Sequence, residues 1–180
     1  FAENRDDRET WRISDQFFFG TELMAAPVVE EDSVKRRLYL PKGTWTNFFT
    51  GEEKNGGEWI TEKHDYLSIP LMVRENSIVI MGAHDDKPDY DYADGAEVRI
   101  YTLQDGKEAA SVVYDMKQNV DLTVSAKKEG GKISIHTEGG KPYTIRLVNV
   151  KAASANGATV AVDGNDTIVT PSSNDIEITL

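Results

Sequence analysis

Apolar residues along this chain occur in short runs that end at Gly, Pro, Asn or Asp, a pattern typical of β-strands joined by turns. In the first part of the chain the predicted strands are 23–29, 37–40, 44–49, 59–60, 69–73 and 77–81. In the second part they are 97–103, 109–114, 121–126, 132–137, 143–148, 159–162, 167–170 and 175–180. Turns such as Asn55-Gly56-Gly57 suit hairpins, because Asn and Gly tolerate positive φ. The pattern therefore predicts short antiparallel strands.

Strict alternation in the second part shows which side of a strand is buried. In residues 132–137 (KISIHT), Ile133 and Ile135 are two residues apart and share one face. The apolar residues of 175–180 (DIEITL) do the same. A sheet with one apolar face needs a second layer to cover that face, so we expect a sandwich or jelly roll.

The first residues differ from the rest. Ser14 and Asp15 precede the run 16–19 (QFFF), and Gly20 follows it in the position of a helix C-terminal cap. This segment predicts a short helix at the start of the chain.

An acidic segment rich in turn residues separates the two sets of strands. Residues 82–95 (GAHDDKPDYDYADG) have the composition of an interdomain crossing. The predicted fold class is all-β, with two antiparallel β-sandwich-like domains and a short N-terminal helical tail. The expected division is a tail over 1–20, a first β domain over 21–86, a linker over 87–92 and a second β-sandwich domain over 93–180.

Composition excludes several classes of protein. The chain has 180 residues, of which 39% are hydrophobic and 28% charged. This hydrophobic content is enough to build a core and argues against intrinsic disorder. It has no Cys, which excludes disulfides, thiolate metal sites and a Cys nucleophile. The formal net charge of -11 would repel a phosphate backbone, so nucleic acid is not an expected partner.

Location and completeness give two further expectations. No apolar run approaches the roughly 20 residues that span a bilayer, and the start of the chain (FAENRDDR) lacks a signal-peptide form. We therefore expect a soluble, cytoplasmic protein. Because the chain begins with Phe1, we interpret it as a portion of a longer polypeptide.

The sequence offers no convincing catalytic or metal-binding group. The acidic clusters 6–7, 30–32 and 85–86 lie in predicted loops, where a solvated charge run is the ordinary interpretation. Asp89, Asp91 and Asp94 resemble a calcium loop, but the fifth and sixth positions hold Ala93 and Asp94 instead of an oxygen ligand and Gly. Whether the 85–94 loop binds a cation is left open.

The sequence also lacks the motifs of nucleophilic catalysis, zinc binding and nucleotide binding. His64, His84 and His136 show no zinc-ligand spacing, and the chain contains no G-x-S-x-G, G-x-G-x-x-G or Walker sequence. We expect no catalytic residue, no cofactor and no metal.

Aromatic residues could stack on sugar rings. Trp11, Trp45 and Trp59, with Tyr90 and Tyr92, are the candidates. Apolar neighbours favour core positions for Trp45 and Trp59, whereas the two tyrosines are expected at the surface.

Three stretches follow one another along the chain with motif-like sequences: residues 15–28 (DQFFFGTELMAAPV), 38–45 (LYLPKGTW) and 69–78 (IPLMVRENSI). In this order they resemble three motifs of glycoside hydrolase family 31. The first is similar to the family block that connects the catalytic barrel to the C-terminal domains. Residues 87–90 (KPDY) and 103–109 (LQDGKEA) resemble the bacterial α-xylosidase branch. The similarity is clear over residues 15 to about 110, and beyond them the strand pattern stands alone.

The resemblance implies what the longer protein does. Family members are retaining hydrolases in which two Asp residues of a (β/α)8 barrel act as nucleophile and as acid and base. Both lie upstream of the block that opens this chain, so no catalytic residue can be carried over. Residues 1–20 would then be the tail of the barrel.

The expected function is the noncatalytic C-terminal portion of an α-xylosidase or α-glucosidase type enzyme. Its expected partners are the upstream barrel of the same polypeptide, an α-xyloside or α-glucoside substrate of the full enzyme and a second subunit. The alternatives are a carbohydrate-binding β-sandwich module and a domain that serves assembly. The exact sugar and the oligomeric state are left open.

Overall fold

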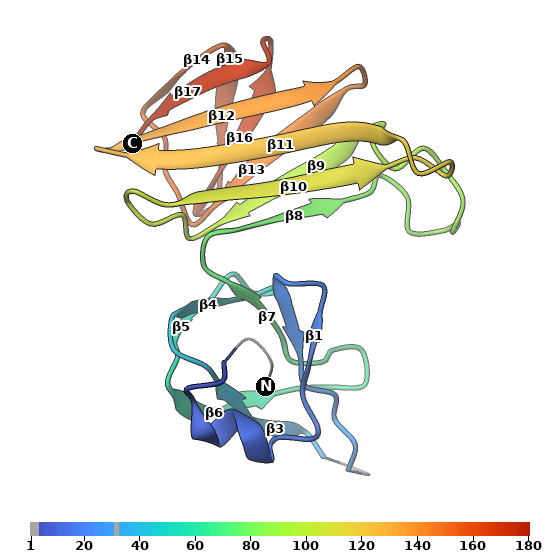
Figure 1. Ribbon diagram of the computed structural model, residues 1–180, viewed down its shortest axis with the longest axis vertical. Coiled ribbons are helices and arrows are strands. Elements are labelled where there is room, and N and C mark those ends of the chain that lie inside the picture. The colour runs from blue at the N-terminus through green and yellow to red at the C-terminus, as the bar shows by residue number, and fades with distance from the viewer. Residues whose placement is uncertain (1–3, 31–32) are drawn as a thin grey trace. The chain divides into compact units, whose positions relative to one another are not determined.

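The computed structural model describes residues 4–30 and 33–180 (Figure 1). The chain divides into two compact units, Phe1–Glu75 and Asn76–Leu180. Each unit has a hydrophobic cluster of its own. The prediction of an all-β chain with antiparallel sheets is confirmed.

The first unit combines a sheet with a separate strand pair. Its elements are η1 (Arg8–Arg12), β1 (Phe17–Phe19), β2 (Leu23–Ala25), β3 (Lys35–Leu40), β4 (Thr44–Asn47), β5 (Glu53–Asn55), β6 (Glu58–Lys63) and β7 (Leu71–Arg74). The sheet has the order β1-β2-β7-β4-β5, and β3 pairs with β6. Trp45, Leu38, Leu40 and Met72 are buried together between these strands. The core of the unit therefore joins the sheet to the β3–β6 pair.

The prediction of a helix near residues 14–20 is wrong, because residues 17–19 form a strand. The 3-10 helix η1 lies earlier, where Asp7 caps it by accepting the N–H of Glu9 (3.2 Å). Phe17–Phe19 forms strand β1, paired from Phe17↔Ala25 to Phe19↔Leu23, and Gly20, with φ 71°, lies in the connecting turn. Pairing with β2 overrides the local capping signal, because aromatic residues also suit strands. The same Gly that resembles a helix cap turns a hairpin.

The second unit is a sandwich of two sheets. Its strands are β8 (Ser77–Met81), β9 (Ala96–Tyr101), β10 (Glu108–Tyr114), β11 (Val120–Glu129), β12 (Lys132–Gly139), β13 (Tyr143–Val148), β14 (Ser154–Asn156), β15 (Ala158–Asp163), β16 (Asp166–Pro171) and β17 (Asp175–Thr179). One sheet, the β11 sheet, has the order β10-β11-β12-β17-β14, and the other, the β13 sheet, has the order β15-β16-β13-β9-β8. Most neighbours are antiparallel, whereas β13 and β9 are parallel.

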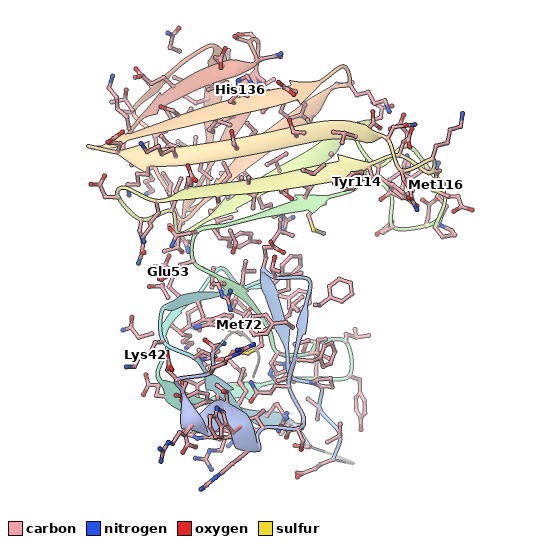
Figure 2. All side chains as sticks on the ribbon, viewed as in Figure 1. Lys42, Glu53, Met72, Tyr114, Met116 and His136 are labelled. Carbon is pink, nitrogen blue, oxygen red and sulfur yellow. The ribbon has the colours of Figure 1, made fainter. Side chains whose placement is uncertain are left out.

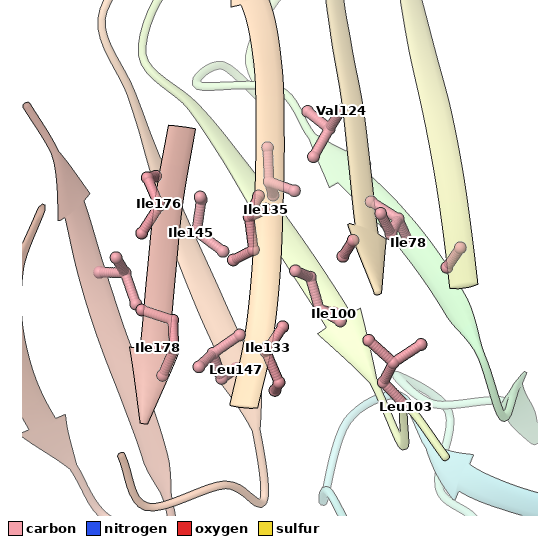
Figure 3. Close-up of a cluster of buried hydrophobic side chains, with 14 of the residues drawn as sticks. Ile78, Ile100, Leu103, Val124, Ile133, Ile135, Ile145, Leu147, Ile176 and Ile178 are labelled. Atoms are coloured by element: carbon pink, nitrogen blue, oxygen red, sulfur yellow. The ribbon is translucent and has the colours of Figure 1, made fainter. Parts of the chain in front are cut away.

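The core of the second unit lies between its two sheets (Figure 3). Ile133 and Ile135 of β12 point inward, and Lys132, Ser134 and His136 are exposed, as alternation along a strand requires. Ile145 and Leu147 of β13 face them from the other sheet. The alternating pattern in the sequence therefore predicts the buried face correctly.

The division between the units differs from the expected boundary at residues 86–87. It falls between Glu75 and Asn76, because β8 pairs with β9 from Ser77↔Tyr101 to Met81↔Glu97. Ile78 belongs to the core of the second unit. The expected linker over 87–92 therefore lies in the loop between two strands of one sheet. Pro, Gly and Asp enrich any long loop, so composition could not distinguish the two situations.

Candidate functional site

The motif segments of the sequence come together in the first unit. Asp15 Oδ2 lies 2.5 Å from Arg36 Nη2 on β3. Gln16 Nε2 donates to the backbone carbonyl of Tyr39 (2.9 Å), and the Tyr39 N–H donates to Gln16 Oε1 (2.8 Å). The Gln16 side chain thus forms hydrogen bonds with the backbone N–H and C=O groups of Tyr39 on β3, as a neighbouring strand would. This pair of bonds is a structural role for the Asp-Gln start of residues 15–28.

The tyrosine that Gln16 holds also contacts the N-terminal segment. The Tyr39 hydroxyl donates to Asp7 Oδ2 (2.8 Å). Burial, together with this hydrogen bond and the negative charge of Asp7, raises the pKa of Tyr39 to about 12. Tyr39 therefore stays protonated at neutral pH and acts as a donor that ties residues 4–12 to β3.

A second set of contacts joins the turn after β3 to the turn after β7. The indole N–H of Trp45 donates to the Pro41 carbonyl (2.7 Å). Glu75 Oε2 accepts the N–H of Thr44 (2.6 Å), and the Glu75 N–H donates to the Thr44 carbonyl (2.9 Å). The Arg74 guanidinium lies 4.8 Å from the ring centroid of Phe18, a cation–π distance. The three motifs therefore build one packed core.

Several large apolar side chains of the first unit remain exposed. Phe17 and Phe19 project from β1 opposite Phe18, which packs on the core. Tyr66 and Leu67, in the loop before β7, are each 94% exposed, and Val29 is exposed as well. Residues 24–26, between these exposed side chains in the sequence, are buried.

The acidic clusters are accounted for by local contacts or by solvent. Asp91 Oδ1 accepts from Lys141 Nζ (2.7 Å), which also contacts Asp121 of β11, so the acidic loop is anchored to the sheet. Lys141 lowers the pKa of Asp91 through this hydrogen bond. Asp85 and Asp86 are exposed. In the cluster 30–32, residues 31 and 32 lie outside the described residues.

The histidines lie in three different environments. Both ring nitrogens of His64 are buried without a hydrogen-bond partner among the described residues, and burial lowers its pKa. His84 packs its ring against Tyr90 at a centroid distance of 5.1 Å. His136 Nδ1 lies 2.6 Å from Asp175 Oδ1, and this hydrogen bond raises the pKa of His136.

No metal site is formed by the part of the chain that the structure describes. Within residues 4–30 and 33–180, no group of three or more His, Cys, Asp or Glu side chains could hold a metal ion. The expected absence of catalytic residues stays a prediction.

Among the aromatic residues, Trp45 is buried as expected, but the core position predicted for Trp59 is wrong. Trp59 is 39% exposed, with Arg37 lying 4.6 Å from its ring centroid. Trp11 is exposed. Tyr90 and Tyr92 are half-buried rather than fully exposed, since their rings pack edge to face at 4.8 Å.

In the second unit, a shallow depression lies on the outer face of the β11 sheet. Its volume is about 740 Å³. Small side chains, Ala110, Ser125 and Ser134, alternate there with longer polar ones such as His136 and Glu177. In the paired register Ser125 lies opposite His136, and His136 lies opposite Asp175. The face offers many hydrogen-bonding groups and no aromatic platform among its lining residues.

Together the contacts define a protein with two β units of mostly antiparallel strands, of which the first is organised by the three motifs. Residues 1–79 match the family model described as Glycosyl hydrolase family 31 C-terminal domain, and residues 91–180 match the one described as Alpha-xylosidase YicI, C-terminal domain. The chain belongs to glycoside hydrolase family 31. The resemblance carried by the motifs is thereby confirmed.

Curated relatives agree with this family. Alpha-xylosidase XylQ of Lactiplantibacillus pentosus is 32% identical over 142 residues, which cover 77% of this chain and 18% of that protein. Alpha-glucosidase 2 of Bacillus thermoamyloliquefaciens is 28% identical over 178 residues, or 92% of this chain and 22% of that protein. The chain thus spans only a small part of the length of these relatives.

Solved structures share the fold. The dextranase FjDex31A of Flavobacterium johnsoniae, complexed with glucose, aligns with a TM-score of 0.79 at 20% identity, covering 99% of this chain and 28% of that one. The GH31 alpha-xylosidase of Xanthomonas citri aligns with a TM-score of 0.62 at 26% identity, covering 81% of this chain and 18% of that one. Among the described residues, no helix has the length and apolar character needed to cross a bilayer.

Proposed function

We propose that this chain is the noncatalytic C-terminal part of a retaining α-xylosidase or α-glucosidase type enzyme, and that it packs against the catalytic barrel of the same polypeptide. The observation that carries the proposal is the apolar surface of the first unit. Phe17 and Phe19, with Tyr66 and Leu67, stay exposed on a unit whose core is already complete. Contiguous exposed apolar side chains mark surfaces that another domain covers, and Phe17 and Phe19 share one face of β1.

A hydrolysis assay tests the absence of catalysis. The 180-residue chain alone should not hydrolyse p-nitrophenyl α-xyloside or α-glucoside. The same chain fused behind the catalytic barrel of Alpha-xylosidase XylQ, in place of that enzyme's matching residues, should support hydrolysis. Activity in the chain alone would contradict the noncatalytic role.

A pair of variants tests the packing. Phe17→Ser combined with Phe19→Ser should lower the thermal stability and the activity of the fused enzyme, because both changes remove apolar contact area. Val162→Ser is the matched control, since Val162 is an exposed apolar residue of the second unit. Equal effects of both changes would count against the proposed surface.

A carbohydrate-binding module is the second candidate function, supported by the depression on the β11 sheet. Hydroxyl, imidazole, amide and carboxylate groups in that depression could bond to sugar hydroxyls. Titration calorimetry with xylose, isoprimeverose and glucan oligosaccharides tests it. Binding that disappears in His136→Ala would support the module, and absence of heat with every sugar would remove it.

The cytoplasmic location stays a prediction.

A further inference from the structure

Strand β10 forms an edge of the β11 sheet, and β8, at the edge of the other sheet, lies beside it (Figure 1). β10 pairs with β11 on one side, and none of the other described strands pairs with its second side. Natural edge strands usually carry Lys, Pro or a bulge that discourages pairing with another chain. Residues 109–114 (AASVVY) have no charge and no Pro. The pairing of β10 with β11 has one irregularity: Val113 pairs with Leu122 and Tyr114 pairs with Val120, so Asp121 has no partner residue. The extra residue lies on β11, and β10 has no bulge of its own.

The same strand exposes apolar side chains. Val112 and Tyr114 project from the outer face and are 41% and 53% exposed. Met116 and Val120, in the turn and at the start of β11, are exposed too. Figure 2 shows Tyr114 and Met116 toward the same end of the hairpin. This edge therefore combines a side that no described strand pairs with and apolar side chains that another strand would cover.

We propose that β10 pairs antiparallel with β10 of a second copy of this chain, about a twofold axis at Ser111. A two-fold contact places each residue opposite its counterpart across the axis. Ala110 then lies opposite Val112 of the second copy, and Glu108 lies opposite Tyr114. This inference goes beyond the proposed function and does not depend on it.

The charges at the two ends of the strand select this register. Lys107 and Asp115 both continue the ladder with β11, since the Lys128 N–H donates to the Lys107 carbonyl and the Asp115 N–H donates to the Asn119 carbonyl. With the axis at Ser111, Lys107 lies opposite Asp115 of the second copy, at both ends of the contact. Opposite charges in directly paired positions are favourable.

Neighbouring registers lose this match. An axis at Ala110 takes Asp115 to position 105 of the second copy, and an axis at Val112 takes Lys107 to position 117. Both positions lie in turns outside β10, so neither axis pairs Lys107 with Asp115. Self-pairing about Ser111 is therefore the register in which the uncharged residues of the two strands face each other and Lys107 faces Asp115 at both ends.

Mass measurement tests the assembly. Size-exclusion chromatography with light scattering, across a hundredfold range of concentration, should show a dimer of the 180-residue chain. Val112→Lys should weaken dimerisation at least tenfold, because it places a charge against the apolar contact. Val162→Lys is the matched control, since Val162 on β15 is also exposed (68%). Circular dichroism checks that both variants fold.

Cysteine cross-linking tests the register. The chain has no Cys, so a single introduced Cys can only join two copies. Directly opposed residues of antiparallel strands have Cα atoms about 4.5–5.5 Å apart, within the range of a disulfide. Ser111→Cys should therefore oxidise to a covalent dimer much faster than Ala110→Cys, whose counterparts lie two positions apart. A monomer at every concentration, a dimer unaffected by Val112→Lys, or equal cross-linking at both positions would overturn the proposal.

Discussion

At the residue scale, the motif residues act through hydrogen bonds that span long stretches of sequence. Gln16 reaches the backbone of Tyr39, and Glu75 reaches that of Thr44. Each side chain satisfies backbone groups that no strand partner satisfies. Short polar signatures in a family can therefore reflect folding requirements rather than chemistry.

Replacing Gln16 should weaken the first unit. Gln16→Ala removes two hydrogen bonds to Tyr39, each contributing about 0.5–1.5 kcal/mol, so the free energy of unfolding should fall by about 1–3 kcal/mol. Urea unfolding followed by Trp fluorescence measures this unit selectively, because Trp11, Trp45 and Trp59 all belong to it. Lys63→Ala, at an exposed position of β6, is the control and should change little. A loss below a few tenths of a kcal/mol would contradict the role given to Gln16.

The histidines should titrate in opposite directions. The hydrogen bond to Asp175 raises the pKa of His136 above its ordinary 6.5, whereas burial lowers the pKa of His64 below 6.5. Protonated His136 therefore adds stability that is fully present below pH 6.5 and is lost as pH rises through its folded pKa. Asp175→Asn should lower the pKa of His136 and leave that of His64 unchanged. NMR titration of the imidazole signals measures both, and an unshifted His136 in the variant would contradict the assignment.

At the scale of elements, turns decide how hairpins dock. The turn between β5 and β6 packs on the turn after β3, where the Gly56 N–H donates to the Gly43 carbonyl (2.7 Å) and the Gly57 N–H donates to the Leu40 carbonyl (2.7 Å). A Cβ on Gly56 would lie 1.8 Å from the Pro41 carbonyl oxygen. Residue 56 must therefore be Gly because of a close backbone approach, not because of its own φ.

Gly56→Ala should destabilise the first unit. The added methyl group has to displace backbone rather than a flexible side chain, and overpacking of this kind costs about 1–3 kcal/mol. Gly140→Ala, where nothing lies within 4 Å of the added carbon, is the control. Thermal unfolding followed by Trp fluorescence for the first change and by circular dichroism for the second measures the effects. A Gly56→Ala protein as stable as the parent would refute the docking argument.

Elements with little apolar pattern escaped prediction. β5 (Glu53–Asn55) and β14 (Ser154–Asn156) are short and polar, and each exists because a neighbouring strand offers hydrogen bonds. In contrast, β12 and β17 follow from strict alternation, which determines the buried face without any tertiary information. The resemblance to a family predicted that the motifs carry no catalytic residue. The contacts that the motif residues make became visible only in the folded structure.

At the scale of the whole molecule, the two units have separate cores and should unfold separately. All Trp residues report the first unit, whereas far-UV circular dichroism reports both. In urea, the Trp transition and the circular dichroism transition should therefore have different midpoints, which two-state unfolding of the entire chain forbids. Residues 76–180 expressed alone should fold with dispersed NMR signals. Coincident transitions, or an unfolded 76–180 fragment, would show that the units depend on each other.

The sequence by itself determined the all-β class, the positions of the long alternating strands, the buried faces of β12 and β17 and the family. These properties depend on local periodicity and on motif order, which are present along the chain. Tertiary structure decided that residues 17–19 pair as a strand, that β8 joins the second unit and that Trp59 lies at the surface. Each of these depends on which distant strand supplies hydrogen bonds or apolar cover, and no local pattern carries that information.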